Sequence, residues 1–119
     1  MDNKIRDLLQ AAIDKTGRDE LSWTAFDSDS FRAKIGPGYL HIQRGSIQVS
    51  PDGVDFYPAV TYSVQISDAQ GRVVAEAETR EMREDFGLFG QLFEAARKAA
   101  LGSDRVIDDM LHTLRGSRR

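Results

Sequence analysis

The stretch that decides the fold is residues 60–79, VTYSVQISDAQGRVVAEAET. Apolar residues alternate strictly with polar ones from Val60 to Ile66, which is the period of a strand with one buried face and one wet face. Residues 68–71, Asp-Ala-Gln-Gly, have the composition of a tight turn, and a second strand-like run continues from Arg72 to about Thr79. The segment therefore predicts an antiparallel β-hairpin.

More strand-like sequence lies upstream of this hairpin. The runs cover residues 23–26, 31–35 and 39–49. Residues 36–38, Gly-Pro-Gly, separate the second run from the third. Within the third run, Gly45-Ser46 indicates a bulge or a tight turn. The strand count between residues 21 and 50 is therefore two or three. Ser50-Pro51-Asp52-Gly53 is typical of a turn, and we expect a loop through Pro58.

Residues 3–16 have the pattern of an amphipathic helix. Its apolar residues are Ile5, Leu8, Leu9, Ala12 and Ile13, which fall at i, i+3, i+4, i+7 and i+8. Asp2 is placed to cap the helix, and Gly17 can take the left-handed conformation that ends one.

Two more helices are predicted at the C-terminal end, from Asp85 to Leu101 and from a cap at Ser103 onward. Gly87 and Gly90 weaken the first of them, which we interpret as a sign of close approach to the sheet or to another helix. The short connection at Gly102 cannot carry the two helices to opposite faces of the sheet. We therefore expect them to pack as a pair that buries Phe93 and Leu111 against the strands.

The predicted fold class is α+β, with an N-terminal helix, an antiparallel meander of about five strands and two C-terminal helices packed on one face of the sheet. Short turns between the strands leave no room for crossover helices. At 119 residues the chain is expected to form a single domain over 1–119, with a frayed tail at 115–119.

Composition excludes several classes of function. The formal net charge of −3 argues against a general nucleic-acid binder, because such proteins neutralise phosphates with basic side chains. Since the chain has 0 cysteines, it has no disulfide and no cysteine-based metal site. Charges are frequent among residues 1–20, and no apolar run reaches the roughly 18 residues that a membrane span needs. We expect a cytoplasmic protein with no membrane partner.

No motif for catalysis is present. His41 and His112 are the side chains best suited to proton transfer, but neither belongs to a motif, and the alternation around His41 points it away from the core towards solvent. The run Asp27-Ser28-Asp29-Ser30 lacks the rest of a calcium loop, so we interpret it as a polar turn. Glu76 and Glu78 share a strand face and are interpreted as solvated. We predict no catalytic, cofactor or metal residues, and an enzyme is the less favoured interpretation of this sequence.

The leading functional prediction is a non-catalytic protein-interaction module that forms a homodimer. The C-terminal helices carry more large apolar groups than one small sheet can cover, so some remain for a partner, which is this chain itself or another protein. The predicted partner-binding residues are Phe86, Phe89, Met110 and Leu114.

Two alternatives stay open. One is a small-molecule-binding or enzymatic domain with a pocket between sheet and helices, lined by aromatic residues. Those residues are Trp23, Phe31, Tyr62, Phe89 and Phe93. The weaker alternative is binding of single-stranded nucleic acid on the open sheet face. That reading uses Arg32, Lys34, Tyr39, His41 and Arg44.

Overall fold

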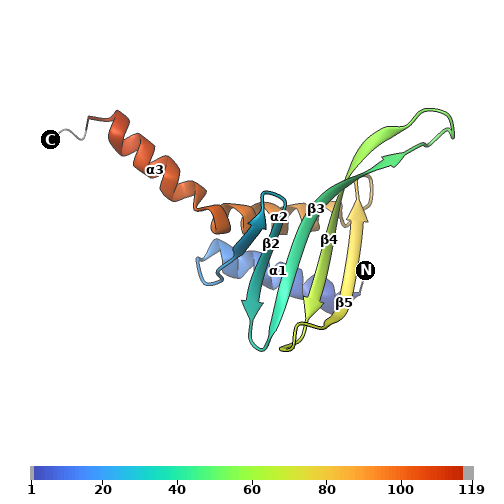
Figure 1. The fold of residues 1–119 in the computed structure, drawn as a ribbon, viewed down its shortest axis with the longest axis horizontal. Coiled ribbons are helices and arrows are strands. Elements are labelled where there is room, and N and C mark those ends of the chain that lie inside the picture. The colour runs from blue at the N-terminus through green and yellow to red at the C-terminus, as the bar shows by residue number, and fades with distance from the viewer. Residues whose placement is uncertain (1, 117–119) are drawn as a thin grey trace.

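The strands form one antiparallel sheet in which each strand pairs with its neighbour in sequence, in the order β1-β2-β3-β4-β5 (Figure 1). The computed structural model describes residues 2–116, apart from the side chains of residues 103 and 104. The elements are α1 (Asn3–Gly17), β1 (Thr24–Asp27), β2 (Ser30–Ile35), β3 (Gly38–Val49), β4 (Tyr57–Ser67), β5 (Val73–Arg80), α2 (Phe86–Leu101) and α3 (Ser103–Leu114). The predicted α+β class, with its N-terminal helix, five-stranded meander and two C-terminal helices, is confirmed.

The region between residues 21 and 50 contains three strands, β1, β2 and β3. The predicted interruption at Gly45-Ser46 is wrong, because β3 pairs with β4 without a break from Tyr39 to Val49. β4 also begins earlier than the predicted loop through Pro58 allows. The turn between β1 and β2 is polar, as predicted, and the Asp27 carboxylate accepts a hydrogen bond from the backbone N–H of Asp29 at 2.8 Å.

Helix α1 begins as its sequence predicts and ends differently. The Asp2 carboxylate accepts hydrogen bonds from the backbone N–H groups of Lys4 and Ile5, which supplies the predicted cap. The helix continues through Gly17, and the left-handed residue after it is Asp19, with φ 61°. Asp tolerates that conformation better than most residues, so glycine was not required there.

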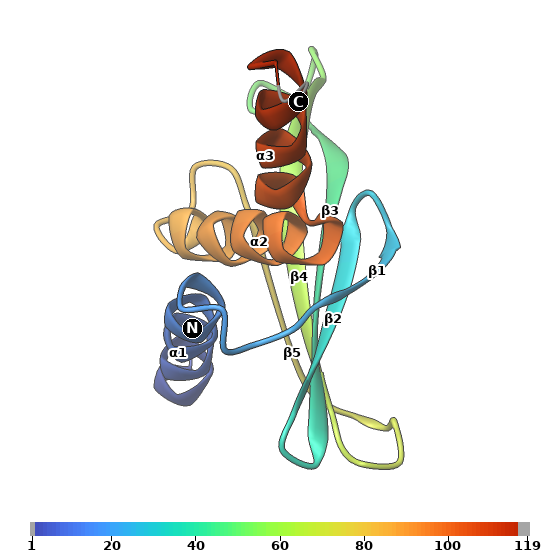
Figure 2. The same cartoon turned by 90° about the vertical axis from the view of Figure 1, so that its left-hand side faces the viewer.

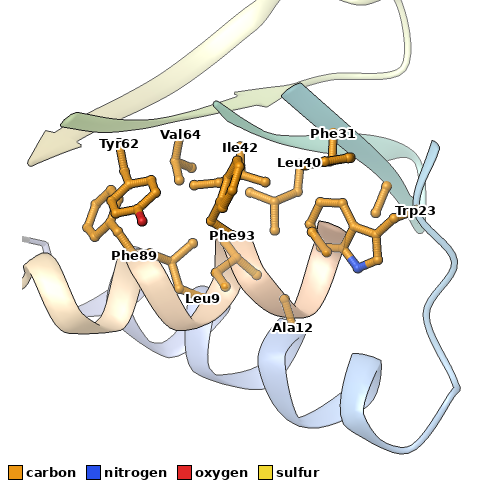
Figure 3. Packing of buried hydrophobic residues seen from close by; sticks show 13 residues of the cluster. Leu9, Ala12, Trp23, Phe31, Leu40, Ile42, Tyr62, Val64, Phe89 and Phe93 are labelled. Atoms are coloured by element: carbon orange, nitrogen blue, oxygen red, sulfur yellow. The ribbon is translucent and has the colours of Figure 1, made fainter. Parts of the chain in front are cut away.

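The core lies between one face of the sheet and the two helices α1 and α2. α2 crosses the strands, and α1 packs against α2 (Figure 2). The largest fully buried side chains come from both layers and include Leu9, Phe31, Leu40, Ile42, Phe89, Leu92 and Phe93 (Figure 3). The Trp23 indole N–H donates to the Thr16 hydroxyl at 2.9 Å, which ties the segment before β1 to the end of α1.

Helix α2 approaches the sheet at one of its two glycines. A Cβ atom at Gly90 would lie 3.5 Å from the ring of Tyr62, an ordinary van der Waals distance, so this turn of the helix packs on β4 without requiring a glycine. A Cβ atom at Gly87 would have nothing within 4 Å. The predicted approach to the sheet is therefore found at Gly90 and not at Gly87, and it does not explain why either residue is glycine.

The predicted burial of Leu111 is wrong, whereas that of Phe93 is confirmed. Phe93 is 0% exposed and Leu111 is 38% exposed. α1 already occupies the place beside α2 that the prediction gave to α3. Gly102 takes the left-handed conformation that ends α2, with φ 63° and ψ 37°, and occupies the cap position that was predicted for Ser103. Of the predicted frayed tail, residues 117–119 lie outside the described part of the chain.

Candidate interaction surface

Helix α3 carries an apolar stripe that the rest of the described chain leaves uncovered. Its packing is largely confined to the end of α2, and it projects away from the body (Figure 1). The exposed members of the stripe are Val106 47%, Ile107 53%, Met110 60%, Leu111 38% and Leu114 81%. Their spacing puts them on one side of the helix, because residues three and four apart are neighbours on a helical surface. We call this set the α3 stripe.

The four predicted partner-binding residues separate into two pairs. Met110 and Leu114 lie together on the α3 stripe and are exposed. Phe89 is 0% exposed and belongs to the core, so its side chain is not free for a partner. Phe86 is half-buried, with its ring 5.2 Å from that of Tyr62. Periodicity alone could not separate these pairs, since both helices have the same kind of apolar pattern.

A second apolar surface lies on the hairpin arm, by which we mean residues 46–60. β2 pairs with β3 only as far as Gln43, and β5 pairs with β4 only as far as Thr61. The arm is therefore a two-stranded ribbon with no further strand on either side, and it extends beyond the sheet (Figure 1). Its exposed large apolar residues are Ile47 41%, Val54 76%, Phe56 65% and Tyr57 53%.

The tip of the hairpin arm is ordered by Asp52. Its carboxylate accepts hydrogen bonds from the backbone N–H groups of Val54 and Asp55, at 2.8 and 2.9 Å. These bonds hold the pKa of Asp52 below its ordinary value, because they stabilise the charged form. Val54 and Phe56, which follow this turn, are exposed.

A groove lies where the hairpin arm meets the segment after β5. It has a volume of about 690 Å³. Its lining consists of Gln48, Val49, Ser50, Pro51, Tyr57, Pro58, Ala59, Arg80, Glu81 and Met82. Glu81 ties the segment after β5 to β4, because its carboxylate accepts a hydrogen bond from the Val60 N–H at 2.6 Å. We call this feature the arm groove.

The outer face of the sheet, opposite the helices, is polar with aromatic groups at one edge. The Arg32 guanidinium lies 5.0 Å from the ring centre of Phe26 and 4.6 Å from that of Tyr39. Arg44 lies on the other face, over the Phe93 ring at 4.6 Å, where it also binds Asp29. The five residues of the predicted nucleic-acid platform are therefore divided between two faces.

His41 makes a contact that the sequence reasoning missed. Its Nε2 lies 2.5 Å from the Ser30 hydroxyl, and its ring meets Phe26 edge to face. Arg32 pairs with His41 and Ser30 pairs with Gln43 across β2 and β3, so serine and histidine are diagonal neighbours on the outer face. The prediction that His41 points away from the core is right, but it is half-buried rather than solvated.

Burial lowers the pKa of His41, which favours its neutral form. Neutral imidazole can accept the Ser30 hydroxyl proton in a hydrogen bond. Ser30 is only 5% exposed, and neither residue lines the arm groove. The contact therefore satisfies a buried hydroxyl group and does not by itself make a nucleophilic site.

The space between sheet and helices is filled by side chains. The five aromatic residues that were predicted to line a pocket are all between 0% and 7% exposed and belong to the core cluster. Within the described residues, no three metal-ligating side chains gather in one place. No helix in residues 2–116 has the length and apolar character to span a membrane.

Two surfaces thus stand out from the body of the molecule, the α3 stripe and the hairpin arm with its groove. No protein family, curated protein or solved structure gave a significant match to this chain.

Proposed function

We propose that this protein is a non-catalytic interaction module that pairs with a second copy of itself through α3. The observation that carries the proposal is the exposure of the α3 stripe, from 38% at Leu111 to 81% at Leu114. A contiguous apolar surface on a projecting element is typical of protein–protein contact sites.

In an isolated chain, the apolar side chains of α3 remain partly in water. Full burial of an aliphatic side chain contributes about 1.5–3 kcal/mol, and every member of the α3 stripe forgoes part of that contribution in an isolated chain. The body offers no free place for the stripe, because α1 and α2 already cover the inner face of the sheet. A second copy supplies exposed apolar surface of its own that can cover the stripe, and two-fold pairing is the commonest arrangement among homo-oligomers.

Light scattering and sedimentation equilibrium of the purified protein test the proposal. We expect a dimer at tens of micromolar that dissociates on dilution. Leu114→Glu places a charge where the partner would cover it, so it should raise the dissociation constant at least about tenfold, which corresponds to about 1.4 kcal/mol.

His112→Glu is the matched control. His112 follows Leu111 on α3 and lies on the side away from the stripe, by the helical spacing of about 3.6 residues per turn. This variant adds the same side chain to the same helix, and the dissociation constant should stay within a factor of about two of the parent value. A strict monomer at tens of micromolar, or equal effects of the two variants, contradicts the proposal.

A further inference from the structure

We infer that each α3 docks into the arm groove of the second copy, so that the two chains exchange their projecting elements. The inference rests on the proposed function and names the surface that receives α3. It is carried by the shape of the protein, the area of the two surfaces, the unpartnered hairpin arm and the charges beside the groove.

The shape of the chain is extended for its size. The radius of gyration over Cα atoms is 17.2 Å, with extents of 62 × 41 × 22 Å. A compact domain of this length has a radius of gyration of about 13.5 Å. The excess comes from α3 and the hairpin arm, which leave the body on opposite sides and diverge (Figure 1). Figure 2 shows both of them rising towards the same end of the molecule.

This arrangement allows a reciprocal contact. In a two-fold pair, a contact between two different surfaces of the two chains is made twice. When the copies face each other at the end towards which both elements rise, α3 of one chain can lie beside the hairpin arm of the other, and the same contact recurs on the second side. Both α3 stripes and both arm grooves are then occupied, so the assembly is complete with two copies.

Area distinguishes this arrangement from direct pairing of the two α3 helices. A 12-residue helix is about 18 Å long. At about 25 cal/mol per Å², the 1.5–3 kcal/mol of a fully buried aliphatic side chain corresponds to roughly 60–120 Å². Five half-exposed side chains thus supply only a few hundred Å² per chain, whereas a stable interface buries about 800 Å² per partner. Adding the hairpin arm to α3 brings the contact towards that size.

The hairpin arm itself needs a partner. An isolated two-stranded ribbon is marginally stable in water. The arm nevertheless holds four residue pairs of β3 and β4, from Ser46–Val60 to Val49–Tyr57, with no third strand beside them. A helix laid across the ribbon supplies the packing that the chain does not provide.

Met82 provides a further indication at the rim of the arm groove. Its side chain is 99% exposed, and its backbone has φ 79°, a left-handed conformation that is uncommon for a residue other than glycine. Backbone conformations of this kind cost about 1–3 kcal/mol and tend to occur where a binding surface requires them. A helix in the groove covers the Met82 side chain.

Charge complementarity favours the same occupant. Arg80 lines the arm groove and makes no ion pair with any described residue. Asp108 and Asp109 of α3 also make none within residues 2–116. Successive residues of a helix are about 100° apart, so these two carboxylates flank the α3 stripe on its two sides. One of them can reach Arg80 while the stripe fills the groove.

Because the chain has 0 cysteines, introduced cysteines report on the contact without interference. Met110→Cys marks the middle of the α3 stripe, and Gln48→Cys marks the arm groove. Both variants keep full length, and both are treated with a short bis-maleimide, each alone and after mixing and equilibration. We expect a cross-linked dimer from the mixture, at least tenfold more than from either variant alone.

Gln70→Cys serves as a control, because it is exposed in the turn between β4 and β5, at the opposite end of these strands from the arm groove. Mixed with Met110→Cys, it should give no cross-link above background. Light scattering is measured on every sample, so that the two proposals fail in distinguishable ways.

A monomer by light scattering overturns both proposals. A dimer in which Met110→Cys cross-links efficiently with itself overturns the exchange and leaves the proposed function standing, because α3 then pairs with α3. A dimer in which no combination cross-links also overturns the exchange. Cross-linking of the mixed Met110→Cys and Gln48→Cys proteins alone supports it.

Discussion

Helices α2 and α3 are separated by one residue, Gly102, yet they meet opposite environments. α2 buries Phe89, Leu92, Phe93 and Ala96 completely, whereas the apolar side chains of α3 are all at least 38% exposed. Both helices show the apolar spacing of an amphipathic helix. Periodicity therefore identifies the side of a helix that avoids water, and it does not identify the surface that covers that side.

The largest expected effect separates the two helices by stability. Phe93→Ala removes a ring that packs against Phe31 and Tyr62, with ring centres 5.4 Å apart in both pairs. It should cost about 3–5 kcal/mol of the free energy of unfolding, because truncation of a buried Phe leaves a cavity. Since domains of this size are stable by about 5–15 kcal/mol, the variant should be marginal. Denaturation in urea at low protein concentration provides the measurement.

Leu111→Ala is the matched change on α3. At the same low concentration it should lower the free energy of unfolding by less than about 1 kcal/mol, because the side chain is partly in water. A loss comparable with that of Phe93→Ala would show that α3 is packed within its own chain, and the comparison between the two helices would break down.

A smaller effect tests how each helix is attached at its start. The Thr79 hydroxyl, in a side chain 2% exposed, donates a hydrogen bond to the Asp85 carboxylate at the beginning of α2. The N-cap residues of α2 and α3, Asp85 and Gly102, make no side-chain cap hydrogen bond, so the Thr79–Asp85 contact is what ties the start of α2 to β5. Thr79→Val should therefore cost about 1.5–3 kcal/mol, the range for a hydrogen bond to a charged group, measured by chemical denaturation. Thr113→Val on exposed α3 is the control, and it should change the stability by less than about 0.5 kcal/mol.

The two histidines allow the same comparison, because His41 lies in the sheet and His112 lies on the projecting helix α3. His41→Ala leaves the buried Ser30 hydroxyl without its partner and should cost about 1–2 kcal/mol. His112→Ala changes an exposed side chain of α3 and should cost less than about 0.5 kcal/mol in dilute solution. Equal losses in thermal or urea unfolding would mean that the Ser30–His41 contact contributes nothing.

The smallest effect is a dependence on pH. Burial lowers the pKa of His41 below its unfolded value of 6.5, so the unfolded chain binds the proton more readily. The contribution of neutral His41 to the free energy of unfolding is therefore complete above pH 6.5. It is lost as the pH falls from 6.5 through the pKa of His41 in the folded chain. His41→Gln should remove this component of the pH profile, and His112→Gln should retain it. A profile that His41→Gln leaves unchanged would contradict the assignment.

Much of the fold follows from the sequence because its signals are local. The alternation in Val60–Ile66 and the turn at 68–71 specify a hairpin whatever surrounds them, and Asp2 caps α1 through its own neighbours. The prediction that Leu111 is buried was wrong because it depended on which helix lies beside α2. Only the folded chain shows that α1 lies there. Gly45 suggested an interruption, yet the long pairing of β3 with β4 carries the strand through it.

The surfaces were predictable in part. Met110 and Leu114 were identified by an excess of apolar residues over what one sheet can cover, whereas Phe89 satisfied the same pattern inside the core. The Ser30–His41 contact needed the register of β2 and β3, which the turn at Gly36-Pro37 sets by pairing Ile35 with Gly38. The arm groove combines residues from the hairpin and the segment after β5, so no local signal revealed it.

Hydrogen–deuterium exchange at two protein concentrations tests the claim that α3 is left uncovered by its own chain and covered by a second copy. We expect amides of α2 between Phe89 and Ala96 to be protected equally at both concentrations, because they belong to the core of one chain. Amides of α3 from Val106 to Leu114 should exchange rapidly in the dilute sample and become at least tenfold slower in the concentrated one. Strong protection of α3 that persists on dilution, or rapid exchange at both concentrations, would contradict the claim.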